Sequence, residues 1–372
     1  MKLGLFSIGD VYPEHRPVRY EQVLRSLWAL AGESERAGFS DLWIAEHHFQ
    51  SSGVYPSPSV LLAALGQFVH RLRLGAMVNV LSIRSPLLLA EDLCLLDQVL
   101  GGRLNIGVGS GYVPLELLAF GVGASQRRTL FQEHLDRLLL ALRGERVPTP
   151  GGLVRLNVLP VQRPHPPVTW AIQGRESLTQ AARRGFGVAV LPYAMTTDVT
   201  GLSDLVRDYH REQGPGASGA FRAVCHIYVG PHPDRAREAL QRHLDSRMFS
   251  QDTFYQGDRR RPPTRIRVPE LEDRGFALLG SERDVTEGLE AWRRSGVDEL
   301  LVSLDFGDLS LSEALETIQT LGRAFPGELT QAPDPEESPR LAALPAGFLT
   351  DERSVDSEWS SHQELGPFRR PK

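Results

Sequence analysis

The residues best suited to chemistry are Glu46-His47-His48-Phe49, at the end of a short apolar segment. Two histidines suggest a metal ion, but adjacent residues of a strand point to opposite sides, so His47 and His48 cannot easily bind one ion. His226 and Asp305, near the ends of later apolar segments, leave a metal-dependent hydrolase open as an alternative. A lone histidine at the end of a strand fits either a structural hydrogen bond or a role as general acid or base.

A second candidate is the stretch Gly174-Arg175-Glu176-Ser177, which joins an apolar segment ending at Gln173 to a helical pattern. At such a turn, free backbone N–H groups and the positive end of the helix converge. The hydroxyl of Ser177 can add a donor, and Arg175 can add charge. The stretch therefore predicts an anion site, with a plain helix cap as the alternative.

These residues must be positioned by a parallel sheet, because short apolar segments alternate with longer segments of helical period. The expected strands are Leu3–Ile8, Asp41–Ala45, Leu72–Val78, Leu104–Val108, Val168–Gln173, Gly187–Leu191, Phe221–Val229 and Glu299–Leu304. Eight strands, each followed by a helix, most simply close into a (β/α)8 TIM barrel, an α/β fold whose sites lie at the carboxyl ends of the strands. The glycines of Gly107–Gly111 follow the fourth strand rather than the first, so an open dinucleotide-binding sheet is the weaker alternative.

We expect a single barrel domain over residues 1–326. Its seventh βα unit carries an irregular insertion at about residues 248–275, which includes Arg259-Arg260-Arg261-Pro262-Pro263 and could either cover an active site or be an idle loop. Residues 327–372 are rich in Pro, Ser, Asp and Glu, and we expect them to form a disordered or extended tail outside the core.

The composition excludes several classes of function. The chain has 372 residues, of which 41% are hydrophobic, and its net charge of −5 predicts no binding to nucleic acid or to an anionic membrane. The only lysines, Lys2 and Lys372, are poorly placed for Schiff-base chemistry, which removes the aldolase-type barrels. Cys94 and Cys225 form no Cys-x-x-Cys pair, so we expect no structural zinc and no disulfide. We see no signal peptide and no membrane-spanning run, and we expect a cytoplasmic protein.

The segment Trp43–Phe49 resembles the bacterial luciferase-like flavin-dependent monooxygenase family. The resemblance continues, in the family's order, through Gly53–Pro58, Ser85–Asp92, Gly107–Tyr112 and Pro160–Val168. It runs from the start of the chain to about Arg184 and is weaker beyond. The ordered set of motifs is specific, whereas no single motif is. The resemblance implies the same barrel and an oxidoreductase that uses reduced FMN and oxygen.

The resemblance also implies roles for individual residues. His47 would lie beside the flavin ring and support its reaction with oxygen, with His48 as a structural partner. A non-prolyl cis peptide would lie beneath the ring at Met77-Val78-Asn79. Gln173 and the stretch Gly174–Ser177 would bind the flavin phosphate, with the Glu176 side chain pointing away.

One residue departs from the family pattern. Members often carry an arginine within the glycine loop, where it contacts the phosphate, and this chain has Ser110 there. A hydroxyl can donate one hydrogen bond but lacks the charge and the two-point fork of a guanidinium. Cofactor binding is then weaker, or Arg175 compensates, or the chain is a non-catalytic flavin-binding relative.

The expected substrate pocket is apolar, because water must be kept from the reacting flavin. Its candidate walls are aromatic residues near the strand ends, although each fits ordinary packing as well. These residues are Phe6, Tyr12, Phe49, Tyr55, Tyr112 and Tyr193.

The mechanism implied by the resemblance has two components. A separate flavin reductase supplies FMNH2, which reacts with O2 to give a flavin C4a-peroxide, and this species oxygenates a small-molecule or carrier-tethered substrate, with a slight hint of secondary metabolism. We expect a homodimer, because family members often pair through their second and third helices. A deazaflavin (F420)-dependent oxidoreductase of the same barrel superfamily is the nearest alternative.

Overall fold

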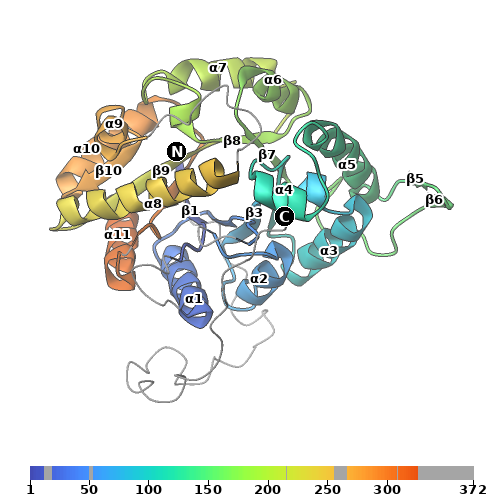
Figure 1. The fold of residues 1–372 in the computed structure, drawn as a ribbon, viewed down its shortest axis with the longest axis horizontal. Helices are drawn as coiled ribbons and strands as arrows, with labels where there is room; N and C mark the ends of the chain where they lie inside the picture. Colours follow the sequence, from blue (N-terminus) through green and yellow to red (C-terminus); the bar gives the residue numbers. More distant parts are fainter. Residues whose placement is uncertain (12–18, 50–52, 215, 255–265, 308, 326–372) are drawn as a thin grey trace, which may run out of the picture. The chain divides into compact units, whose positions relative to one another are not determined.

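The computed structural model describes residues 1–11, 19–49, 53–214, 216–254, 266–307 and 309–325. Within them, eight parallel strands form a closed barrel with helices around it (Figure 1). In order around the barrel these are β1 (Lys2–Ser7), β2 (Asp41–Ile44), β3 (Arg73–Val80), β4 (Leu104–Gly109), β7 (Val168–Ile172), β8 (Gly187–Val190), β9 (Phe221–Val229) and β11 (Glu299–Ser303). The pairing of β8 with β9, with Val188 opposite Phe221, closes the ring. The predicted TIM barrel is therefore confirmed.

The helices that the helical patterns predicted are present and cover the outer face of the barrel (Figure 1). They are α1 (Tyr20–Arg36), α2 (Pro58–Leu65), α3 (Pro86–Val99), α5 (Arg127–Leu142), α6 (Arg175–Arg183), α7 (Leu202–Glu212), α10 (Glu282–Arg294) and α11 (Leu311–Ala324). Three further helices were not predicted, namely the short α4 (Pro114–Ala119), the long α8 (Pro233–Phe254) and the short α9 (Val268–Asp273). Single turns of 3-10 helix, η1 (Leu81–Ile83) and η2 (Pro192–Ala194), follow β3 and β8.

The segment expected to be an irregular insertion is partly regular. Helix α8 continues to Phe254, and α9 (Val268–Asp273) precedes an extra strand, β10 (Ala277–Gly280). This strand pairs in parallel with the carboxyl-terminal half of β9, beginning with Ala277 opposite His226. A second addition is the antiparallel hairpin of β5 (Val147–Thr149) and β6 (Gly152–Val154). The arginine-rich run at 259–261 and the predicted tail lie outside the described residues.

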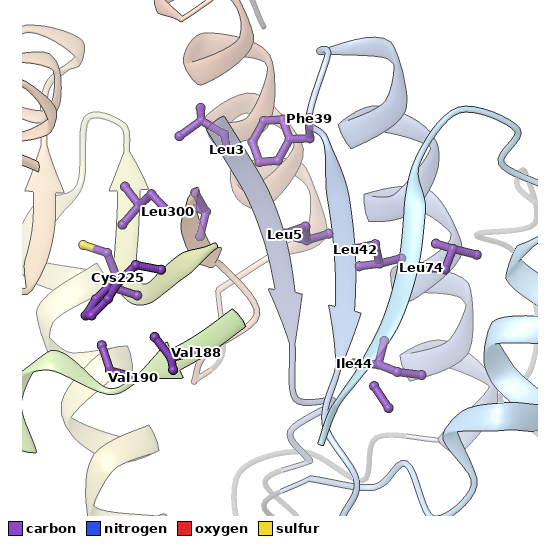
Figure 2. Close-up of a cluster of buried hydrophobic side chains, with 14 of the residues drawn as sticks. Leu3, Leu5, Phe39, Leu42, Ile44, Leu74, Val188, Val190, Cys225 and Leu300 are labelled. Carbon is purple, nitrogen blue, oxygen red and sulfur yellow. The ribbon is translucent and has the colours of Figure 1, made fainter. Parts of the chain in front are cut away.

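The main core lies between the strands and the helices. Alternate strand residues point outward, and Figure 2 shows Leu3 and Leu5 of β1 beside Leu42 and Ile44 of β2 in this layer. These side chains pack against buried helix residues such as Leu27 of α1. Burial of apolar area of this kind provides the main driving force for closing a barrel.

A smaller core fills the inside of the barrel. It includes Phe6, Trp43, Val224 and Leu301, which come from four different strands. The indole of Trp43 is fully buried and needs space, and Gly75 provides it, since a Cβ there would lie 2.6 Å from Trp43 Cζ3. These side chains fill the interior of the barrel, so any site must lie beyond them, at the carboxyl ends of the strands.

Candidate functional site

A cavity of about 710 Å³ lies at the carboxyl ends of the barrel strands. Its walls come mainly from the ends of β2, β3, β4, β7 and β8 and from the first turns of α5 and α6. Ten residues expected from the sequence to form the site line it together. They are Phe6, His47, Met77, Val78, Ser110, Tyr112, Gln173, Gly174, Glu176 and Ser177.

His47 lies at the end of β2 with its imidazole held on two sides. Its Nδ1 is 2.9 Å from Oε1 of Glu116, which comes from α4, and its Nε2 is 3.5 Å from the hydroxyl of Tyr112. The ring packs against Gly53, where an added Cβ would lie 2.5 Å from His47 Cδ2. Only 7% of His47 is exposed, so its orientation is set by these neighbours rather than by solvent.

Glu46 and His48 form a separate polar network that ties β2 to β3. The buried carboxylate of Glu46 accepts hydrogen bonds from the guanidinium of Arg84 at 2.9 Å and from the backbone N–H of Val80 at 3.1 Å. His48 Nε2 lies 3.0 Å from the same carboxylate. His48 therefore has the structural role expected of it, and the network fixes the two strand ends that flank His47.

The peptide bond between Met77 and Val78 is cis, as expected, and both residues line the cavity. Val78 packs against Gly109 of β4, where a Cβ would lie 2.7 Å from Val78 Cγ2. Asn79 does not line the cavity, in contrast to our expectation. Its side-chain amide points into the protein and donates to the carbonyl of Gly107 at 2.9 Å. The register of β3 against β4 shifts between Ala76 and Asn79, so regular alternation from Met77 does not predict the direction of Asn79.

The part of the cavity lining that follows β4 and β7 is rich in hydrogen-bond donors. Gly174 precedes the first turn of α6, and Ser177 and the glycine-loop residue Ser110 also line this region. Arg127 and Arg128, from the first turn of α5, bring two positive charges to the same cavity. The N-termini of two helices and two guanidinium groups are well suited to an anion such as a phosphate.

Arg175 does not contribute to this donor-rich end, although the sequence suggested that it would. Its guanidinium is turned outward and pairs with Asp208 of α7 at 2.7 Å. Glu176, which we expected to point away, is among the lining residues and accepts a bond from Gln180 at 3.3 Å. The positive charge near the cavity therefore comes from α5 and not from the turn before α6.

Three of the six expected aromatic wall residues lie elsewhere. Phe49 is 67% exposed and stacks near Phe120, while Tyr55 is fully buried and bonds through its hydroxyl to Ser7 at 3.2 Å. Tyr193 packs against the main core. Tyr112 does line the cavity, and Tyr12 lies outside the described residues.

The apolar walls come instead from residues inside the barrel and at the ends of later strands. These residues are Phe6, Ile8, Trp170, Leu191 and Val224. Phe6 was expected here from the sequence. The other four were not singled out, because alternation along a strand does not distinguish the inner layer of a barrel from its outer core.

Glu116, Arg127 and Arg128 are the other candidate residues that the sequence analysis missed. Glu116 is only 3% exposed, and a buried carboxylate is a sign of function or of an ion pair. It lies in the first turn of α4, which begins two residues after Tyr112, and no local pattern in the sequence singled it out.

A second buried polar cluster lies around Asp305, which accepts a bond from Ser7 at 2.5 Å. Burial raises the pKa of Asp305 to about 7. His226 is stacked edge-on against His243, whose Nδ1 contacts the carboxylate of Asp10. Over the described residues, no three His, Cys, Asp or Glu side chains form a group suited to a metal ion.

Within the described residues, no helix combines the length and apolar character needed to cross a membrane.

The fold and site define a TIM-barrel protein with a cis peptide on its third strand and a cavity lined by hydrogen-bond donors near its fifth barrel strand. The model of the luciferase-like monooxygenase family matches residues 1–299, and the chain belongs to this family. The protein y4wF of Sinorhizobium fredii is 31% identical over 78% of this chain and 88% of its own length. Limonene 1,2-monooxygenase of Rhodococcus erythropolis is 26% identical over 70% of each chain.

Solved structures show the same fold at low sequence identity. The monooxygenase RslO1 of Streptomyces bottropensis superposes with a TM-score of 0.74 at 22% identity, covering 87% of this chain and 98% of its own. The oxygenating constituent of 3,6-diketocamphane monooxygenase of Pseudomonas putida, in complex with FMN, gives 0.68 at 18%, with 87% and 97% covered. The coenzyme F420-dependent tetrahydromethanopterin reductase of Methanopyrus kandleri gives 0.63 at 16%, with the same coverages.

Proposed function

We propose that this protein is a two-component monooxygenase that binds reduced FMN in the cavity and uses O2 to oxygenate an organic substrate. The observation that carries the proposal is the meeting, in one cavity, of an imidazole, the Met77-Val78 peptide and a donor-rich end. A separate flavin reductase would supply the reduced cofactor, because nothing in the described fold resembles a second nucleotide-binding domain.

The residues present fit FMN by their chemistry. The phosphate would be held by Ser110, Arg127, Arg128 and the N-terminal turn of α6 that includes Ser177. Guanidinium groups and backbone N–H donors are the usual partners of a phosphate dianion. Arg127 therefore takes over the charge that Ser110 lacks. The ring system would lie toward Met77 and Val78, with His47 at its edge.

Bound reduced FMN supplies the electrons with which oxygen is activated, while the protein orients the reactants. His47 is the group placed to accept or donate a proton at the cavity surface. Phe6, Ile8, Leu191 and Val224 keep water from the reacting end, since these side chains offer no hydrogen bonds. The substrate would enter on this apolar side, either as a small molecule or tethered to a carrier.

A deazaflavin-dependent oxidoreductase is the second candidate. It is favoured by the fold shared with the F420-dependent reductase, whereas the fold shared with an FMN complex favours FMN. A flavin-binding protein without catalysis is the third candidate, favoured by Ser110 and opposed by the buried, hydrogen-bonded His47.

Equilibrium titrations of the protein with FMN, anaerobic FMNH2 and reduced F420 separate the candidates. The proposal expects saturable binding of FMNH2 tighter than that of reduced F420, followed on adding O2 and substrate by one 18O atom of 18O2 in the product. Tighter binding of F420 favours the deazaflavin enzyme. Reoxidation of bound FMNH2 at the same rate in wild type and His47→Asn, with no labelled product from any substrate tried, favours the non-catalytic binder.

The protein is also proposed to form a homodimer through α2 and α3. Leu88 and Leu95 of α3 are 66% and 58% exposed, one heptad apart on the same face, and Val60 of α2 is 67% exposed. Large apolar side chains that line up on one helical face are typical of a surface that is buried in an assembly.

A further inference from the structure

Glu116 makes two hydrogen bonds with a single oxygen. Its Oε1 lies 2.9 Å from His47 Nδ1 and 2.9 Å from the backbone nitrogen of His48. A backbone N–H can only donate, so Oε1 is an acceptor in that contact. An ionised carboxylate is an acceptor in both contacts, which requires the proton of the neutral imidazole to be on Nδ1.

The two side chains that form this contact, those of His47 and Glu116, are both buried. The side chains of His47 and Glu116 are 8% and 4% exposed, so water cannot take the place of either partner. A hydrogen bond to an ionised group is stronger in such surroundings than in water. The carboxylate is delivered by α4, whose first residue, Pro114, follows two residues after Tyr112.

With the proton on Nδ1, the lone pair of His47 is on Nε2. This nitrogen is 3.5 Å from the hydroxyl of Tyr112, and the two rings meet edge to face with centroids 5.9 Å apart. Both His47 and Tyr112 line the cavity. The basic nitrogen and a phenolic donor therefore stand side by side at the cavity surface.

We infer that Glu116 is a positioning residue that holds His47 in its Nδ1–H form, so that Nε2 acts as the base of the cavity and Tyr112 as its proton partner. In the step this allows, a proton passes from a donor in the cavity to the lone pair of Nε2, while Nδ1 keeps its proton. The imidazolium so formed is balanced by the charge of Glu116, and no electron is transferred. The role in catalysis rests on the proposed function, but the proton position does not.

The other charged groups near His47 are already engaged. Glu46 is bound by Arg84, His48 and the N–H of Val80, and it does not contact the imidazole of His47 in any described interaction. Among the described residues, Glu116 from α4 and Tyr112 from the loop after β4 are thus the titratable groups that contact the ring. Removing the charge of Glu116 should make protonation of His47 less favourable.

Long-range 1H–15N spectra of 15N-histidine-labelled protein, without flavin, test the proton position directly, with the His47 signals assigned from His47→Asn. We expect wild-type His47 to carry its proton on Nδ1. Glu116→Gln should keep it there, because the amide oxygen can accept the same bond. Glu116→Leu should move it to Nε2, where the Tyr112 oxygen can accept it. Glu133→Gln, an exposed residue of α5, is the matched control and should match wild type.

A proton on Nε2 in wild type, or an unchanged His47 signal in Glu116→Leu, overturns the inference whether or not the protein oxygenates anything. With the oxygenation reaction in hand, Glu116→Leu should lower kcat about ten- to hundredfold, as expected for loss of a charge-assisted hydrogen bond. Glu116→Gln should move the acid limb of the pH profile of kcat/KM to lower pH. A pH profile of kcat/KM that is unchanged in Glu116→Gln contradicts the positioning role of Glu116. This measurement does not depend on Glu116→Leu, so it can be made even if Glu116→Leu fails to fold.

Discussion

Substitution of Gly53 by alanine should disable the site at a cost of about 1–2 kcal/mol in stability. Gly53 has φ +92°, and a Cβ built on it would lie 2.5 Å from Cδ2 and 2.9 Å from Cγ of the His47 ring. Carbon atoms pack at about 3.5–4.0 Å, so the imidazole must move by about 1 Å. A misplacement of that size can lower a rate by about a hundredfold.

Gly101→Ala is the matched control for this prediction. Gly101 also has a positive φ of +58°, but a Cβ there meets no atom within 4 Å. Both variants carry the backbone cost of a left-handed alanine, about 1–2 kcal/mol, so urea unfolding should show similar losses of stability. Only Gly53→Ala should lose the oxygen reaction of bound FMNH2, measured by stopped flow. If Gly53→Ala and Gly101→Ala react with oxygen at the same rate, the packing of Gly53 against His47 is not required for the reaction.

Three further perturbations have defined outcomes. Arg127→Ala should weaken FMN binding about 10- to 100-fold in fluorescence titrations, whereas Arg175→Ala, whose guanidinium is bound to Asp208, should leave it unchanged. Burial raises the pKa of Asp305 to about 7 from 3.8, so the folded state holds this proton more tightly, and stability should fall as the pH rises from about 4 to 7. Asp305→Asn should remove up to about 4 kcal/mol of that fall in urea unfolding, and an unchanged pH dependence would contradict the assignment. Leu88→Glu with Leu95→Glu should convert a dimer into a monomer in sedimentation experiments; a dimer that persists excludes this face.

The barrel was predictable because its signal is periodic and repeated. Each predicted strand is an apolar run with a helical pattern after it, and closure follows once eight such units are counted. Strand β10 and helix α8 were not predicted, for two different reasons. Ala277–Gly280 is only four residues long, and α8 has a largely polar surface with a weak apolar stripe.

The candidate site was predictable where a residue's role depends on its own strand. The position of His47 at the mouth follows from the end of β2, and that of Gly174 from the turn between β7 and α6. Which arginine brings positive charge to the cavity was not predictable in this way. Arg175 lies next to the expected phosphate site in the sequence, but its guanidinium pairs with Asp208 of the following helix and points outward. Arg127, which lines the cavity, belongs to another βα unit.

The same limit explains Glu116 and Tyr55. Whether a side chain near a strand end enters a cavity depends on partners far away in sequence, 69 residues for the bond between His47 and Glu116 and 48 for that between Ser7 and Tyr55. Such pairings are decided by the packing of whole elements, which a local pattern does not describe.

A crystal structure of the protein with bound FMN tests the central claim most directly. The account predicts electron density for the phosphate between Ser110, Arg127 and Ser177, and for the ring against Met77-Val78 with His47 at its edge. Density for FMN outside this cavity, or a ring that does not approach His47, would contradict it.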